Sequence, residues 1–217
     1  MRLITRLSIL LVTVSWMNTA LAQDAINTEK FTYTFKTGDT SALLTYNGKS
    51  HAFSFAIPGK GVTQQDVDTK QPNQVFINAG KTLVQVSLIP LPQPIAPAVQ
   101  LSSLTDDQIK GTLENYVQYE IDYMKNDLKL NPHNLKKEWR TISGKLVLVW
   151  YFEFDVGTKE ADKTVTAQAY ISSICYNQVV DLNIPLYTPG DADAANTLLA
   201  GIQASLKTFD KPANGGN

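Results

Sequence analysis

The stretch KLVLVWYFEFD, residues 145–155, decides the fold of this 217-residue sequence. It is rich in β-branched and aromatic residues, which favour a pleated strand. Because successive side chains of a strand point to opposite faces, Leu146, Leu148, Trp150, Phe152 and Phe154 form one wholly apolar face. The opposite face begins with valines and turns polar at its end. This pattern predicts a central strand with one face fully buried.

Two short loops predict how the neighbouring strands pair. Two-residue loops at 143–144 and 176–177 each join a pair of apolar-rich stretches, which is typical of antiparallel hairpins. The resulting opposite residues are Ile142 with Lys145, Trp139 with Leu148, Arg140 with Val147, Lys136 with Tyr151, Ile171 with Leu182, Ala169 with Ile184, Ser172 with Asp181 and Tyr170 with Asn183. We therefore expect an antiparallel meander.

A longer polar connection, residues 156–163, joins the two hairpins. Placing Asp155 opposite Thr164 pairs Trp150 with Ala169 and Tyr151 with Gln168. In this register the apolar face lies under the helices and the reverse face is polar. The expected polar face consists of Lys136, Glu138, Arg140, Tyr151, Glu153, Thr166, Gln168, Tyr170, Ser172, Asp181 and Asn183.

The N-terminal half predicts further strands at 31–35, 40–46, 49–57, 74–78 and 82–89. Asn47-Gly48 is typical of a type I′ turn, since both residues tolerate positive φ. Residues 79–81 predict a second hairpin turn. The stretch 59–73 is polar without a period, so we expect a surface loop. Four prolines within 89–97 predict an extended linker.

Two amphipathic helices are predicted. Thr105 and Gln108 form a capping-box pattern at the start of a helix over 105–130, and Gly111 suggests close packing within it. Thr188-Pro189 predicts the start of a final helix, with Phe209 packed just beyond its end. The expected buried stripes are Ile109, Leu113, Tyr116, Val117, Ile121, Met124 and Leu128 in the first helix and Ala195, Leu198, Leu199, Ile202 and Leu206 in the second.

The first 22 residues have the pattern of a secretory signal peptide. Arg2 and Arg6 precede an apolar run that is too short for a membrane span, and Ala20-Leu21-Ala22 suits a signal peptidase. We expect cleavage after Ala22 and a periplasmic or secreted protein. The rest is read as an N-terminal leader (23–39), one domain (40–210) and a disordered tail (211–217).

Composition excludes several classes of protein. The formal net charge is −1, and the two arginines of the signal peptide contribute to it, so the exported chain is slightly acidic and a poor match for nucleic acid. With Cys175 as the only cysteine, no internal disulfide is possible, and we expect a buried inert thiol. No second apolar stretch is long enough for a membrane span. Packing alone is expected to stabilise the fold.

The order of elements resembles the fold shared by the photosystem II extrinsic protein PsbP and the yeast Ran-binding nuclear import factor. The resemblance covers about residues 40–210 and rests on AFSFAIPGKG at 52–61, LENYVQYEIDYM at 113–124, VVDLNIP at 179–185 and DADAANTLLAGIQASLKTFD at 191–210. It implies an α+β fold, with an antiparallel sheet of about six to eight strands in an α/β/α sandwich with a long and a C-terminal helix. It also implies a non-enzymatic adaptor or assembly role.

No catalytic, cofactor or metal motif stands in the sequence. His51 and His133 are the only histidines, and neither has the partners that a triad or a zinc site needs. Glu153 and Asp155, two residues apart, leave a hydrolase open as an alternative. We expect no enzyme and no cofactor.

The expected function is binding or assembly in the cell envelope, with another envelope protein as partner. The candidate partner-binding residues on the polar face are Arg140, Tyr151, Glu153, Gln168, Tyr170 and Asp181. Two alternatives remain open at this point. One is an immunity-type protein that neutralises a toxin in the periplasm, and the other is a carrier of a small molecule or lipid.

Overall fold

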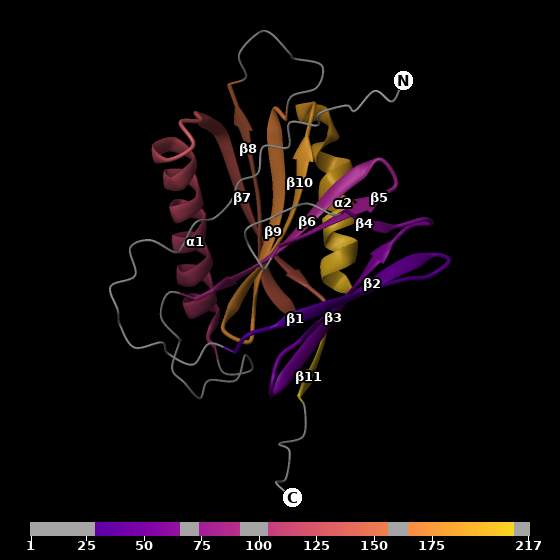
Figure 1. Cartoon of the computed structure of the whole chain (residues 1–217). Coiled ribbons are helices and arrows are strands. Elements are labelled where there is room, and N and C mark those ends of the chain that lie inside the picture. Colours follow the sequence, from indigo (N-terminus) through magenta and orange to yellow (C-terminus); the bar gives the residue numbers. More distant parts are fainter. Residues whose placement is uncertain (1–28, 66–73, 92–103, 156–164, 211–217) are drawn as a thin grey trace, which may run out of the picture.

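A seven-stranded antiparallel sheet is the centre of the fold (Figure 1). The computed structural model describes residues 29–65, 74–91, 104–155 and 165–210. The strand order is β4-β5-β6-β10-β9-β8-β7. The bounds are β4 (Thr63–Gln65), β5 (Gln74–Ala79), β6 (Thr82–Pro90), β7 (Pro132–Ile142), β8 (Lys145–Phe154), β9 (Ala167–Cys175) and β10 (Gln178–Leu186). The decisive stretch is therefore an interior strand, β8.

A smaller sheet of four strands packs beside the large one. It consists of β1 (Thr32–Thr37), β2 (Ser41–Asn47), β3 (His51–Pro58) and β11 (Lys207–Asp210), in the order β1-β2-β3-β11. The sequence predicts β1 to β3 as strands, although β1 lies in the stretch expected as a leader. It did not predict a separate sheet or the strand β11, which joins the end of the described chain to its beginning.

Two helices lie on opposite faces of the large sheet. Figure 1 shows α1 (Asp106–Asn126) on one side, and α2 (Ala192–Ala204) with the small sheet on the other. A single 3-10 turn, η3 (Pro189–Asp191), precedes α2. The predicted class is confirmed: an α+β fold in which a seven-stranded antiparallel sheet packs against a long helix and a C-terminal helix.

Each face of the large sheet has its own hydrophobic core. The core under α1 contains Leu113, Val117, Leu148, Trp150 and Phe152, all buried. The core on the other face joins α2 to both sheets. Its members include Val147, Val149, Ala169, Ile171, Leu182, Ile184, Leu199, Ile202, Leu44, Phe53 and Phe55. Both faces of β8 are thus buried, and the alternation read from its sequence separates the two cores.

The pairings across the short loops are confirmed. Trp139 lies opposite Leu148 in β7–β8, and Ile171 lies opposite Leu182 in β9–β10, as the two-residue loops predict. Ser143, Gly144, Tyr176 and Asn177 all have positive φ, which two-residue hairpin loops require. Residues 80–81 likewise connect β5 to β6, with Ala79 opposite Thr82.

The predicted pairing across residues 156–163 is wrong by one residue. Trp150 lies opposite Tyr170, and Tyr151 lies opposite Ala169. Because a shift of one exchanges the two faces of a strand, Trp150 points away from Ala169 and Ile171, which belong to the opposite core. The single polar face expected from the sequence is therefore not formed.

Helix α1 begins as predicted and ends earlier. Thr105 caps it, and the reciprocal hydrogen bonds with Gln108 form a capping box. The helix stops at Asn126 rather than at residue 130. Lys129 adopts a left-handed φ of 56°, which a right-handed α-helix cannot contain. Gly111 is not a close-packing site, since a Cβ there would meet nothing within 4 Å.

Three further expectations are corrected. The β2–β3 hairpin exists, but neither Asn47 nor Gly48 has positive φ, and the longer turn is closed by a 2.9 Å bond from Gly48 N to His51 O. Strand β4 lies within the stretch 59–73 that was expected to be a loop. Phe209 lies in β11 with 47% of its surface exposed, so it does not pack against α2.

Several expectations fall outside the described residues. These are the signal peptide (1–22), most of the proline-rich linker (89–97), the connection 156–163 and the tail (211–217). Within the described chain, neither helix combines the length and apolar character that crossing a bilayer demands.

Candidate functional site

The six candidate partner-binding residues divide into two groups. Arg140, Tyr151 and Glu153 stay together on the α2-facing side of β7 and β8. Gln168, Tyr170 and Asp181 lie on the other face, where all three are buried. The one-residue shift between β8 and β9 is the cause of this division. In the first group Arg140 is exposed and Glu153 is half-buried, whereas Tyr151 is buried, with 7% of its surface exposed, and packs in the core on the α2 side.

The surface group belongs to a row of polar side chains at the edge of the sheet. We define the β7–β8 strip by its members His133, Asn134, Lys136, Glu138, Arg140, Tyr151 and Glu153. In the described chain β7 pairs only with β8, so it is an edge strand. Most of β7 is exposed. Apart from the buried Tyr151, the strip is thus the part of the predicted polar face that remains open to solvent.

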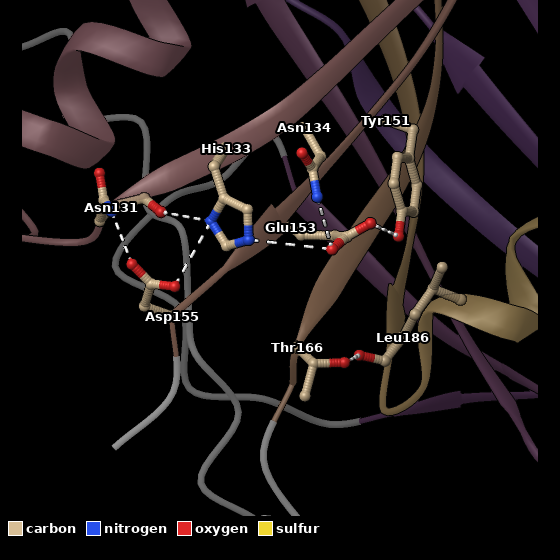
Figure 2. Close-up of polar contacts among 8 residues, drawn as sticks. All are labelled: Asn131, His133, Asn134, Tyr151, Glu153, Asp155, Thr166 and Leu186. Carbon is tan, nitrogen blue, oxygen red and sulfur yellow. Dashed lines mark hydrogen bonds and ion pairs between the residues drawn. The ribbon is translucent and has the colours of Figure 1, made fainter. Parts of the chain in front are cut away.

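Glu153 is the centre of the hydrogen bonds at one end of the strip (Figure 2). The Tyr151 hydroxyl donates to its Oε1 at 2.9 Å, and the Asn134 amide donates to its Oε2 at 3.0 Å. His133 Nε2 lies 3.8 Å from the same Oε2, and His133 Nδ1 lies 3.7 Å from Asp155 Oδ1. Asn131 in turn donates to Asp155 at 2.6 Å. One carboxylate therefore holds three neighbours in a defined arrangement.

A local irregularity in β7 builds this arrangement. The β7–β8 pairing shifts between His133 and Lys136, and Asn134 adopts a left-handed φ of 52°. Asparagine tolerates that conformation better than most residues. The bulge directs the Asn134 amide to Glu153, and the hydrogen bond between them offsets part of the backbone strain at Asn134.

The remaining strip residues are also paired. The Lys136 ammonium lies 5.6 Å from the centre of the Tyr151 ring, within the range of a cation–π contact. Arg140 donates to Glu138 at 2.6 Å. Both contacts lie on the same side of β7, so they fix the directions of two cationic side chains.

The hydrogen bonds also influence the protonation states of Glu153 and Tyr151. Donation from Asn134, then from Tyr151, lowers the pKa of Glu153 below its ordinary value. Burial, then the bond to Glu153, raises the pKa of Tyr151 to about 12. At neutral pH Glu153 is an anion and Tyr151 is neutral. A carboxyl with a lowered pKa suits an acceptor role better than that of a general acid.

The second group of predicted residues belongs to a buried polar cluster under α1. Ser172 donates to Asp181 Oδ1 at 2.5 Å and accepts a 2.8 Å bond from Trp150 Nε1. Asn183 lies 3.5 Å from the other Asp181 oxygen, and the Tyr170 hydroxyl donates to Gln168. Tyr170 stacks on Trp150 with 3.8 Å between ring centres. These residues are part of the interior.

The sequence reasoning missed one member of this cluster, Glu120 on α1. It is only 2% exposed, and its Oε1 has no hydrogen-bond partner among the described residues. The signal was its spacing, since Glu120 lies four residues from both Tyr116 and Met124 in the apolar stripe.

Burial perturbs both carboxyl groups of the cluster. Burial raises the pKa of Asp181 to about 7, although hydrogen bonds from Ser172, Asn183 and Tyr116 act in the opposite direction. Burial, then the charge of Asp181, raises the pKa of Glu120 well above its ordinary value. Each group therefore retains its proton to a higher pH than a carboxyl in water.

Cys175 and His51 lie outside both the strip and the buried polar cluster. Cys175 is buried, and burial raises the pKa of its thiol to about 12, as expected for an inert cysteine. His51 stacks on Tyr176 and contacts Glu29 rather than standing in solvent. Across the described ranges, no group of three or more His, Cys, Asp or Glu side chains has the arrangement to hold a metal ion.

Comparison with known proteins found similarity to solved structures. No protein family and no curated protein matches the sequence. The solution structure of cyanobacterial PsbP from Synechocystis sp. PCC 6803 is similar with a TM-score of 0.48 and 16% sequence identity. The match covers 79% of this chain and 95% of that chain.

Proposed function

We propose that this chain is an exported, non-catalytic binding protein that docks a partner protein of the cell envelope through the β7–β8 strip. The observation that carries the proposal is an exposed edge strand whose polar side chains are already held in place by neighbours. Arginine, present in the strip as the exposed Arg140, is among the residues that most often carry the energy of protein interfaces.

The arrangement of the strip favours recognition by side chains. Glu153 fixes Asn134 and Tyr151, and Glu138 fixes Arg140, so docking would immobilise few additional rotatable bonds. The bulge and the lysines of β7 are features that discourage another chain from adding a strand to a sheet edge. A partner surface with matching donors and acceptors is thus a better fit than an extended peptide.

The interior gives no support to a carrier function. Trp150, Phe152, Leu113 and Met124 are fully or almost fully buried between α1 and the sheet and belong to one packed cluster. The lowered pKa of Glu153 likewise favours binding over acid catalysis. Both observations support our choice of the β7–β8 strip as the docking surface.

A charge-reversal experiment tests the proposal. Lys136→Glu with Arg140→Glu reverses both cations of the strip, whereas the matched control Lys36→Glu with Lys207→Glu reverses two exposed cations of the small sheet. We expect wild type and control to capture the same envelope protein after cross-linking in the exporting cell. The strip variant should lose at least about tenfold in affinity, as several interface contacts would.

Equal capture by the strip variant, with its circular dichroism and thermal unfolding unchanged, would refute docking through this surface. The export part is tested separately by sequencing the N-terminus of the protein from the periplasmic fraction. Gln23 as the first residue is the expected result, and an intact Met1 in a purely cytoplasmic protein contradicts export.

A further inference from the structure

A buried carboxyl pair links α1 to the large sheet. Glu120 lies on the buried side of α1. Asp181 lies on the α1 side of β10, since it accepts from Ser172, which in turn accepts from Trp150 of the core under the helix. Tyr116, one turn before Glu120 on α1, also hydrogen-bonds to Asp181, so the two carboxyl groups share a neighbour. Both side chains are almost wholly removed from solvent. A helix is thus held to a sheet across two acidic groups.

The surroundings of this pair contain hydroxyls and amides but no compensating cation. The groups that face it are Tyr116 from α1, Tyr170 and Ser172 from β9, Asn183 from β10, Gln85 and Ser87 from β6, and the Trp150 indole from β8 through Ser172. In the described parts of the chain, no lysine, arginine or histidine acts on either carboxyl. Two buried carboxylates without a cation repel each other and lack solvation.

The hydrogen bonds around Glu120 and Asp181 also favour a protonated pair. Asp181 receives donors from Ser172 and Asn183, whereas Glu120 Oε1 and Asn183 Oδ1 have no partner among the described residues. A protonated Glu120 leaves a neutral group in the interior, but an ionised one leaves an unsolvated charge. The interior is therefore built for a pair that holds at least one proton.

We propose that α1 is a proton-controlled flap, which docks on the sheet while the Glu120–Asp181 pair is protonated and opens when both groups ionise. The main contacts of α1 with the sheet are to β7, β8 and β9. Helix α2 packs against β3, β9 and β10 and so contacts both sheets. Opening of α1 therefore leaves the other core intact.

The direction of the pH effect follows from linkage. A carboxyl whose pKa is higher in the docked state binds a proton on docking, so docking is favoured at low pH and weakened as pH rises. For Asp181 this pH range extends from its ordinary pKa, near 4, to its raised pKa of about 7. The pKa of Glu120 is shifted in the same direction. Within this range, each proton released on opening raises the opening constant tenfold per pH unit.

Opening would expose an aromatic surface. Trp150 stacks with Tyr170 and lies 5.7 Å from Phe152, and these rings are buried under α1 in the docked state. Tyr116 of α1 meets Trp150 edge to face, so it would leave with the helix. The flap thus hides an apolar face at lower pH and presents it at higher pH.

Native-state hydrogen exchange between pH 5 and 8 tests the proposal on the full chain. The opening constant of each amide is obtained by dividing its exchange rate by the intrinsic rate at that pH. We expect the opening constants of α1 amides to rise at least tenfold from pH 5 to 7 and to exceed those of α2 amides at every pH. Equal opening constants in the two helices would overturn the proposal, because they report global unfolding.

Variants identify the groups responsible. Glu120→Gln with Asp181→Asn keeps the shapes and removes both titrations, so the α1 rise should fall below about threefold. The control Glu114→Gln removes an exposed acid of the same helix, which pairs with Lys137, and should retain the wild-type rise. A full rise in the double variant overturns the proposal. If the double variant does not fold, Asp181→Asn alone must reduce the slope, and an unchanged slope overturns the proposal as well.

Discussion

Ser172 shows how a single polar residue determines which face of β9 is buried with the aromatic side of β8. Its hydroxyl accepts from Trp150 and donates to Asp181, and the side chain is fully buried. By composition, Ala167, Ala169 and Ile171 match the Trp150 face better than Gln168, Tyr170 and Ser172 do. Gln168, Tyr170 and Ser172 nevertheless lie on the Trp150 face, because hydrogen bonds within the buried polar cluster stabilise them there.

Replacement of Ser172 by alanine should be costly. Ser172→Ala leaves the Trp150 N–H without its acceptor and removes a donor from Asp181, so we expect a loss of about 1–3 kcal/mol in the free energy of unfolding. Urea unfolding followed by tryptophan fluorescence measures it. Ser50→Ala, at an exposed turn position, is the control and should stay within about 0.5 kcal/mol of wild type. Equal stability of the two variants contradicts the hydrogen-bonded bridge.

Glu120 could have been found from the sequence. It interrupts an apolar stripe, with Tyr116, Val117 and Met124 buried one turn away, and a charged residue at such a position needs a partner. The partner, Asp181, could not be identified in the same way. Its position under α1 depends on the β8–β9 register, which the sequence leaves open.

At the scale of elements, loop length separates the correct registers from the incorrect one. Two-residue loops permit few backbone geometries, so the pairs of β7–β8 and β9–β10 follow from residues 143–144 and 176–177. The connection 156–163 imposes no such limit, and both faces of β9 are buried. Alternation cannot determine a register when neither face is exposed to solvent.

Two glycines should respond to alanine in opposite ways. Gly111 lies in α1, where a Cβ meets nothing within 4 Å, so Gly111→Ala should stabilise the protein by about 0.5–1 kcal/mol. Gly144 is equally unobstructed but has a φ of 75°, so Gly144→Ala should destabilise by about 1 kcal/mol. Thermal unfolding of both variants measures the difference. Shifts of the same sign would contradict the assigned backbone conformations.

For the whole molecule, the sequence predicts the elements and the large sheet better than their arrangement. Strands β1 to β3 are expected from the sequence, but their second sheet also includes β11, a four-residue strand that follows soon after α2. A strand this short carries almost no alternation signal. Its partner β3 lies about 150 residues earlier, as the Ala56–Ser205 contact does, and no local pattern encodes such a contact.

Global stability should decrease as pH rises from acid to neutral. The raised pKa values of Asp181 and Glu120 mean that folding takes up protons between about pH 4 and 7. Stability is then lost at up to about 1.4 kcal/mol per pH unit for each group. Urea midpoints at pH 5, 6, 7 and 8 measure this trend, which Asp181→Asn should weaken. Below pH 4 the lowered pKa of Glu153 acts in the reverse direction.

The position of β11 has a consequence for the order in which the protein is made. Residues 207–210 are the last part of the described chain, yet they complete the sheet that begins at residue 32. A growing polypeptide leaves the ribosome N-terminus first, so β3 keeps an unpaired edge until residues 207–210 have been made. The small sheet cannot close early. A C-terminal truncation that removes four residues of β11 would leave that edge open for good.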